Sequence, residues 1–303
     1  MLFLGVHHLH AQCPTEDIEL TTQAELDNFV ATYATTCTDI PVSITVSGNN
    51  ISNISGLNFI TSVDGNFKIK STTHATNIDF SNLVNVTGNL EFEENSAVEV
   101  ITGFTNLTEV GGALSFRTNS SLVEISGFNN LVTIGGNVAF AHDYNPFTFP
   151  VLADIDIISG FNSVETIGGT VFMSLYRRLS SFNGFANLET IGGGLWFYKT
   201  YFDNFTGFTS LERIEGTISF YCINWDDADV SAINNFTSLE SIGGISLRGI
   251  FDECITSVGL DFLNNVTTIE GDIEIEEAGI RSGLAGLETI DGSLEFESSD
   301  AFP

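Results

Sequence analysis

A segment of fourteen residues recurs along this chain and constrains its fold more than any other feature. Residues 127–140 read GFNNLVTIGGNVAF, and close copies occupy residues 103–116, 184–197 and 207–220. Most copies follow one another at a spacing of 23 or 24 residues. A fixed period in this range is typical of solenoids, in which each repeat forms one coil. Aligned on the second glycine of the pair, the repeats fall at Gly65, Gly88, Gly112, Gly136, Gly169, Gly193, Gly216, Gly244, Gly271 and Gly292.

Apolar and polar residues alternate directly after this glycine, as in Leu90, Glu91 and Phe92. A period of two predicts a strand with one buried face and one solvent-facing side, and the glycine allows the chain to turn a corner before it. The remaining apolar residues lack helical spacing, so one coil consists of short strands and corners. Because a single coil cannot bury its own apolar stripe, coils must stack in parallel, ~4.8 Å apart. The sequence therefore predicts an all-β, right-handed parallel β-solenoid (β-helix) of about ten to eleven coils of ~24 residues.

The consensus (G)-F-x-N/S-L-x-x-I-G-G-x-L-x-F resembles the receptor L-domain repeat, a right-handed β-helix related to leucine-rich repeats. The resemblance extends from about Ile40 to the end of the chain. That family includes ligand-binding lobes of growth-factor receptors and many secreted bacterial surface proteins. The resemblance implies a secreted bacterial surface protein, and it carries no catalytic or binding residue that can be transferred to this chain.

The composition is acidic, with a formal net charge of −30 and only nine basic residues. Such a field repels nucleic acid and anionic membrane surfaces. No stretch approaches the ~20 apolar residues of a membrane-spanning helix. We therefore expect an extracellular or cell-surface protein with no nucleic-acid partner, no membrane insertion and no cofactor.

The amino-terminal part of the chain divides into two segments that differ from the repeats. Residues 1–12 are apolar and then His-rich, and resemble the remnant of a secretory signal peptide. Residues 13–40 contain apolar residues at helical spacing in 22–33, with Thr21 or Thr22 as the N-cap. The sequence predicts a short helix that caps the solenoid, followed by repeats over 41–303 that end part-way into a coil.

Four cysteines in an export-like chain favour two disulfides over a metal site. Their positions pair Cys13 with Cys37 in the cap, and Cys222 with Cys254 in neighbouring coils. Three coils carry insertions, at residues 141–159, 221–233 and 248–260, and solenoid insertions emerge as loops. One of them contains Asp226, Asp227 and Asp229, a weak calcium candidate that is better explained as a solvated acidic loop.

Outward-facing positions of the repeated strand change character in the middle of the solenoid. Near the two ends they are acidic, whereas in the middle the third and fifth positions after the aligned glycine include four aromatic residues. An exposed aromatic cluster on a soluble protein usually marks an interaction site, although the 141–159 insertion could instead cover this face. The candidate ligand-binding residues are Phe172, Trp196, Tyr198 and Tyr221, with Arg117 as a cationic rim.

Three functions are consistent with these patterns. The favoured one is a non-enzymatic recognition or adhesion module that binds a protein or a glycan through one solenoid face. A β-helix polysaccharide lyase or hydrolase is the alternative, because Glu274 and Glu295 of adjacent coils would approach the ~5 Å carboxylate separation of retaining glycosidases. A purely structural spacer of a longer surface protein is the third.

Overall fold

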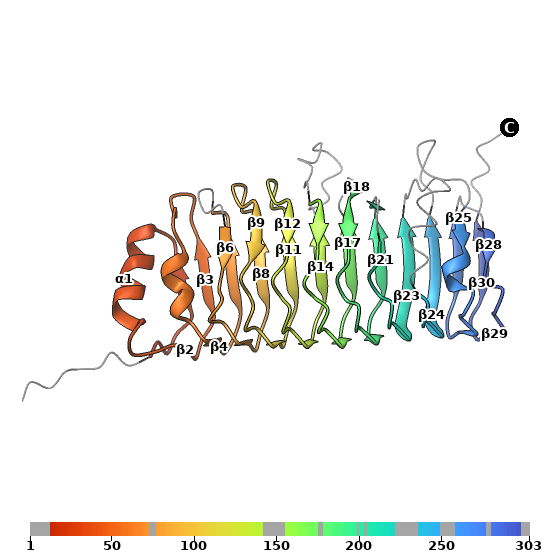
Figure 1. Ribbon diagram of the computed structural model, residues 1–303, viewed down its shortest axis with the longest axis horizontal. Coiled ribbons are helices and arrows are strands. Elements are labelled where there is room, and N and C mark those ends of the chain that lie inside the picture. The colour runs from red at the N-terminus through yellow and green to blue at the C-terminus, as the bar shows by residue number, and fades with distance from the viewer. Residues whose placement is uncertain are drawn as a thin grey trace, which may run out of the picture.

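The chain forms a parallel β-solenoid whose coils stack along one axis, with helix α1 at one end (Figure 1). The structure is a computed structural model that describes residues 13–72, 77–141, 155–174, 178–198, 200–202, 205–221, 236–248, 258–276 and 280–297. Every strand pair described is parallel, as the stacking of successive coils requires. The predicted all-β solenoid is confirmed.

One face of the solenoid is a ladder of strands, most of which begin two residues after an aligned glycine, although two longer strands begin before it. We call it the long-strand face. Neighbouring strands pair in register, so that equivalent residues of successive repeats lie side by side. Strand β1 (Ile18–Leu20) extends this ladder beyond the first repeat by pairing with β3. The remaining strands are β3 (Ile44–Ser47), β5 (Phe67–Lys70), β8 (Leu90–Glu93), β11 (Leu114–Arg117), β14 (Val138–Ala141), β17 (Val171–Ser174), β21 (Leu195–Tyr198), β23 (Arg213–Tyr221), β24 (Ser241–Arg248), β27 (Ile273–Glu276) and β30 (Leu294–Glu297).

Shorter strands form the other faces. The ladder that precedes the glycine pair contains β2 (Asp39–Ile40), β4 (Ser62–Val63), β7 (Asn85–Val86), β10 (Glu109–Val110), β13 (Thr133–Ile134), β16 (Thr166–Ile167), β20 (Thr190–Ile191), β26 (Thr268–Ile269) and β29 (Thr289–Ile290), and the first parts of β23 and β24. A separate sheet contains β6 (Asn77–Asp79), β9 (Val100–Thr102), β12 (Glu124–Ile125), β15 (Ile157–Ile158) and β19 (Ser181–Phe182). Two further pairs are β18 (Arg178–Leu179) with β22 (Tyr201–Phe202), and β25 (Val258–Leu260) with β28 (Ile280–Gly283).

The glycines of the repeat serve two different corners. At the G-G corner the coils approach so closely that a Cβ on Gly135 would collide with the carbonyl oxygen of Gly111 in the coil below. At the G-F corner, Gly127 instead has a φ of +89°, which side chains other than glycine rarely adopt. The left-handed conformation stays at this glycine in Gly103, Gly127 and Gly160, whereas in the coils of Gly184 and Gly207 the following Phe185 and Phe208 adopt it, each with a φ of 61°.

Phenylalanine stacks fill the interior of the solenoid. The rings of Phe104, Phe128 and Phe161 lie at successive centroid distances of 4.8 Å, with interplanar angles of 4° and 10°. A second stack joins Phe92, Phe116 and Phe140 at 5.3 and 5.5 Å. These spacings follow the rise between coils, so one apolar residue per repeat produces a continuous core. The alternation of β5, β8 and β27 is buried and half-buried, as the predicted inside and outside positions require. In the middle of the solenoid, however, four residues predicted to face solvent are buried as well: Ser115, Ala139, Ala141 and Ser174.

Helix α1 (Gln23–Tyr33) covers the amino-terminal end of the core with Leu26 and Phe29. Its N-cap is Thr22, whose hydroxyl accepts from the Glu25 backbone N–H while the Glu25 carboxylate accepts from the Thr22 backbone N–H, a capping box. The predicted Cys13–Cys37 disulfide is present, with a Cα–Cα distance of 5.5 Å. The capping segment also contributes strand β1 and packs near the 3₁₀ helix η1 (Ser55–Phe59), two features that the sequence reading missed.

The end residues of the predicted insertions belong to strands of the regular coil. Residues 141, 221 and 248 are the last residues of β14, β23 and β24. Ile157 and Ile158 form β15, where Ile158 is buried, so the end of the 141–159 segment belongs to the regular coil. Likewise β25 occupies the end of the 248–260 segment, next to the 3₁₀ helix η3 (Asp261–Leu263). The predicted Cys222–Cys254 disulfide and the Asp226, Asp227 and Asp229 cluster lie outside the described residues.

The last described coil leaves apolar side chains uncovered. Leu294 and Phe296 of β30 occupy the inward positions of the repeat, yet they are 52% and 68% exposed. Within the described residues, β30 pairs only with β27, so its outer edge has no neighbouring strand. The equivalent residues of β27, Ile273 and Ile275, are buried because β30 lies over them.

Candidate functional site

The outward side chains of the long-strand face form two columns, because neighbouring strands pair in register. The third-position column reads Lys68, Glu91, Ser115, Ala139, Phe172, Trp196, Ser219, Ser246, Glu274 and Glu295. The fifth-position column reads Lys70, Glu93, Arg117, Ala141, Ser174, Tyr198, Tyr221, Arg248, Glu276 and Glu297. The predicted aromatic residues therefore lie on three consecutive strands.

Trp196 is the most exposed of these aromatic side chains. Trp196 as a whole residue is 48% exposed, whereas Phe172, Tyr198 and Tyr221 are half-buried. The Phe172 and Trp196 rings lie 6.4 Å apart in one column at an angle of 59°. In the other column, Tyr198 and Tyr221 stack at 4.6 Å and 21°. The two pairs join through β21, which carries both Trp196 and Tyr198, and so form a diagonal aromatic strip across the strands.

Small residues next to this strip turn it into a groove. Beyond Trp196 the third-position column continues with Ser219 and Ser246, and before Tyr198 the fifth-position column holds Ala141 and Ser174. The alternation of large rings and short side chains leaves a hollow of about 610 Å³ on the sheet surface. This volume lies within the range of small-molecule binding pockets, roughly 300–1,000 Å³. We refer to this hollow as the aromatic groove.

The position of Trp196 depends on a local exception at Gly194. Equivalent corner positions in other coils hold Asn89, Asn137 or Thr170, whose side-chain oxygens accept from a backbone N–H of the next coil. At residue 194 a Cβ would lie 2.7 Å from Nε1 of Trp196 and 2.6 Å from the carbonyl oxygen of Thr217. The glycine thus has no side chain to form this corner hydrogen bond and gives the indole room to lie against the backbone.

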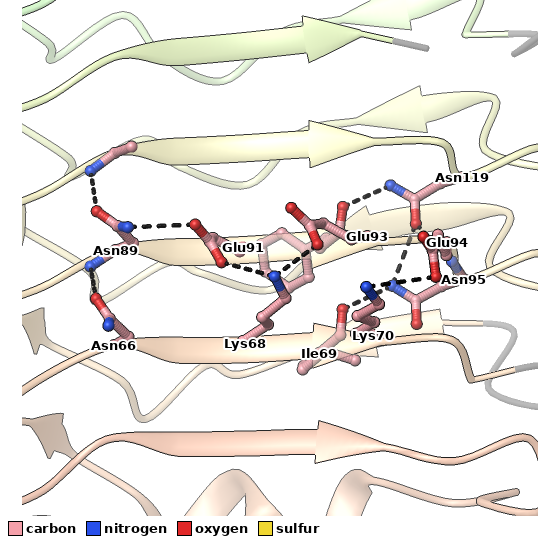
Figure 2. A network of polar contacts seen from close by, with 12 residues as sticks. Asn66, Lys68, Ile69, Lys70, Asn89, Glu91, Glu93, Glu94, Asn95 and Asn119 are labelled. Atoms are coloured by element: carbon pink, nitrogen blue, oxygen red, sulfur yellow. Dashed lines mark hydrogen bonds and ion pairs between the residues drawn. The ribbon is translucent and has the colours of Figure 1, made fainter. Parts of the chain in front are cut away.

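Ion pairs neutralise the long-strand face on the amino-terminal side of the groove (Figure 2). Lys68 lies 2.6 Å from a carboxylate oxygen of Glu93 and 3.2 Å from one of Glu91, and Lys70 lies 3.6 Å from Glu94. Partial burial of Lys68 lowers its pKa, but the hydrogen bonds and negative charges of Glu93 and Glu91 outweigh this effect and raise it. Lys68 therefore stays charged and occupies both carboxylates.

Arg117 is left without an ionic partner among the described residues by this arrangement. It is exposed, it lines the groove, and its register neighbour on the preceding strand is Glu93. Because the Glu93 carboxylate points to Lys68, no carboxylate among the described residues lies within ion-pair distance of the Arg117 guanidinium.

The opposite end of the groove carries a paired arginine. Arg248 lies 3.0 Å from Glu276 and 4.0 Å from Glu274, and both Arg248 and Glu274 line the groove. The structure thus brings all five predicted ligand-binding residues to one hollow. Sequence reasoning did not name Arg248, Ser219 and Ser246 as binding residues. The count from Gly244 misses Ser246 and Arg248 because the register pairs Gly244 with Thr217, one residue after the aligned Gly216.

Catalytic and metal-binding arrangements find little support in the described residues. Glu274 and Glu295 are register neighbours, as the hydrolase alternative requires, but of the two only Glu274 lines the groove. In the described part of the chain no group of three or more His, Cys, Asp or Glu side chains is placed to hold a metal ion. The same part contains no helix that is both long and apolar enough to span a bilayer.

No family model, curated protein or solved structure matches this chain.

Proposed function

We propose that this protein is a non-enzymatic recognition module that binds its ligand, a glycan or a protein, in the aromatic groove. The supporting observation is the exposure of Trp196 at 48% within a hollow lined by three further aromatic rings. Burying exposed aromatic surface releases water favourably, and tryptophan, tyrosine and arginine dominate binding energies at interfaces. A spacer that only separated other domains would need no such cluster at the middle of one face.

Binding without catalysis is favoured over polysaccharide cleavage by the chemistry of the groove. Glycosidases of the retaining and inverting types use two carboxyl groups that flank the scissile bond. Among the described lining residues only Glu274 has a carboxylate, and it lies beside the Arg248 guanidinium at one end. Incubation of the protein with any oligosaccharide that it binds is therefore expected to release no new reducing ends.

We also propose an extracellular or cell-surface location, in keeping with the resemblance to secreted receptor L-domain proteins. The Cys13–Cys37 disulfide supports this location, because such bonds persist in oxidising compartments. Isolation of the protein from its native host tests it. Peptide mapping without reductant should recover Cys13 linked to Cys37 from the extracellular or surface fraction, and recovery only from the cytosol with free thiols would contradict the proposal.

Removal of the Trp196 indole is the experiment that tests the proposed function. Trp196→Ala is expected to abolish binding to ligands found on combined glycan and peptide arrays, while the free energy of unfolding changes by less than ~1 kcal/mol because the indole is half exposed. The matched control is Val84→Ala, which removes an exposed apolar side chain on another face. Unchanged binding by Trp196→Ala, or an equal loss with Val84→Ala, would overturn the proposal.

A further inference from the structure

We propose that the ligand of the aromatic groove is an unbranched oligosaccharide that carries a single carboxylate, with that carboxylate bound by Arg117. The proposal rests on the proposed function and specifies the ligand class for the same groove. It follows from three features of the groove: which hydrogen-bonding groups it offers, which charge lacks a partner, and how charge is distributed around it.

The groove offers side-chain hydrogen bonds rather than backbone ones. It lies on the face of a sheet whose strands β17, β21, β23 and β24 are each paired on both sides, so no free strand edge is present there. An extended peptide bound by strand addition requires such an edge to satisfy its own N–H and C=O groups. A peptide in this groove would leave many of those groups unpaired, at a cost of about 1–3 kcal/mol each when buried.

A sugar ring matches the groove because its two kinds of surface are separated. Its C–H face is apolar and flat and can lie on an aromatic ring, while its hydroxyl groups project from the rim. The groove has the same division, with Trp196 and the Tyr198–Tyr221 stack as apolar surfaces and Ser219, Ser246 and other polar side chains around them. Each hydroxyl can then exchange its water hydrogen bonds for bonds to these side chains.

The carboxylate is inferred from Arg117. Arg117 has a planar guanidinium that forms paired hydrogen bonds with a carboxylate, and the Lys68 ion pairs leave it without an acidic partner. It stands three coils before Tyr198 in the fifth-position column, or ~14 Å at the usual spacing of stacked strands. The ligand must therefore extend along the solenoid axis, so that one end meets Arg117 while other sugars contact the rings.

A polyanionic chain is disfavoured by the surroundings. Beyond the groove, carboxylates outnumber cations: β27 and β30 carry Glu274, Glu276, Glu295 and Glu297, and Arg248 pairs with only the first two. Charges of equal sign within a Debye length, about 8–10 Å, repel a ligand that carries one carboxylate on every sugar. A single charge placed at Arg117 avoids this repulsion.

The test compares matched pairs of unbranched tetrasaccharides, one ending in glucuronate and the other in glucose, together with fully charged oligogalacturonate and a peptide library. The wild-type protein is expected to prefer the mono-carboxylated sugar by roughly tenfold or more, the strength of one charge-assisted hydrogen-bonded contact. Arg117→Ala should remove this preference and leave the affinity for the neutral sugar unchanged. Arg213→Ala, which changes an arginine paired with Glu270 outside the groove lining, should retain the preference.

The outcomes separate this inference from the proposed function. Equal affinity for both members of each pair, tightest binding of oligogalacturonate, or binding of peptides alone would overturn the inference, while dependence on Trp196 would still support a recognition groove. If no glycan or peptide binds through Trp196, both proposals fail. A preference that persists in Arg117→Ala would place the carboxylate elsewhere and contradict the assignment.

Discussion

Single positions of the repeat explain where the groove lies. The aligned third and fifth positions hold charged residues in most coils near the two ends, and those charges pair with their neighbours, as Lys68 does with Glu91 and Glu93. In the middle of the solenoid the same positions hold Phe172, Trp196 and Tyr198, which face outward and do not help to fill the core. Residues that depart from the pattern of their own repeat therefore mark the site.

Inward and outward residues of one strand should differ sharply in their effect on stability. Phe116 is 1% exposed between the rings of Phe92 and Phe140, so Phe116→Ala is expected to lower the free energy of unfolding by ~3–5 kcal/mol. Arg117, the next residue, is exposed, and Arg117→Ala should change the free energy of unfolding by less than ~0.5 kcal/mol. Chemical denaturation of both variants checks the prediction, and equal losses would show that the inside and outside positions are misassigned.

Acid should weaken the ion pair between Arg213 and Glu270. Hydrogen bonds from Arg213, at 2.8 and 2.9 Å, and from Ser241 lower the pKa of Glu270 below its ordinary value of 4.5. A lowered folded-state pKa means that the stabilisation is complete above 4.5 and is lost as the pH falls through that lower folded value. Glu270→Gln should therefore melt at a lower temperature than wild type at pH 7, and the difference should vanish once the pH lies below the lowered folded-state pKa of Glu270.

That comparison has its own internal check. Because the amide in the Glu270→Gln variant does not titrate, this variant should show no loss of stability that depends on position 270 between neutral and acid pH. A melting-temperature difference of the same size at both pH values would mean that the substitution acts through packing rather than through the Glu270 charge. The side chains involved are largely exposed, so the effect on melting temperature is expected to be small.

At the scale of elements, the corner after the long strands depends on a buried hydrogen-bond row. The Asn95 side chain is fully buried, accepts from the Thr72 N–H and hydroxyl, and donates to the carbonyl oxygen of Ile69 and to Asn119 Oδ1. Asn95→Ala leaves several buried polar groups unpaired and is expected to cost about 2–4 kcal/mol in denaturant unfolding. The exposed Asn130 is the control, and Asn130→Ala should cost less than ~1 kcal/mol because water replaces its contacts. Similar losses in both variants would remove the special role of the buried row.

Periodicity in the sequence was sufficient to predict the solenoid, the register of most long strands and five of the residues that line one groove. These features were predictable because every repeat adopts nearly the same backbone geometry. Residues that occupy equivalent positions in the sequence repeats therefore lie side by side in the structure. The alignment at Gly244 is one residue out of register, because Gly244 pairs with Thr217. Strand β1 was missed because it precedes the first glycine repeat and pairs through only three residues. The length of the insertions was overestimated because β15 and β25 lack the full repeat consensus.

Other features of the groove depend on contacts that an alignment does not contain. Arg117 lacks an ionic partner only because Lys68 takes the Glu93 carboxylate across the neighbouring strand, a choice between two possible pairs. The orientation of the Trp196 indole depends on the missing side chain at Gly194 and on the nearby Thr217 carbonyl. Both are settled by side-chain geometry in three dimensions rather than by residue type along the chain.

At the scale of the whole molecule, one elongated surface combines strong negative charge with a single described aromatic groove. The net charge of −30 keeps the long faces from associating with one another, in the way that charged edge and face residues discourage aggregation. The groove interrupts this surface near the middle of the long-strand face, where β17, β21 and β23 lie side by side (Figure 1). A ligand that binds there approaches a region of low charge between two acidic ends.

Hydroxyl-radical footprinting with mass spectrometry tests the central claim most directly, because it measures the accessibility of individual rings with and without ligand. In the free protein Trp196 should be modified much faster than the buried Phe116. Addition of the mono-carboxylated tetrasaccharide should reduce modification of Trp196 and Tyr198 several-fold and leave residues on the other faces unchanged. Slow modification of Trp196 in the free protein, or no protection by any ligand that the protein binds, would contradict a binding site in the aromatic groove.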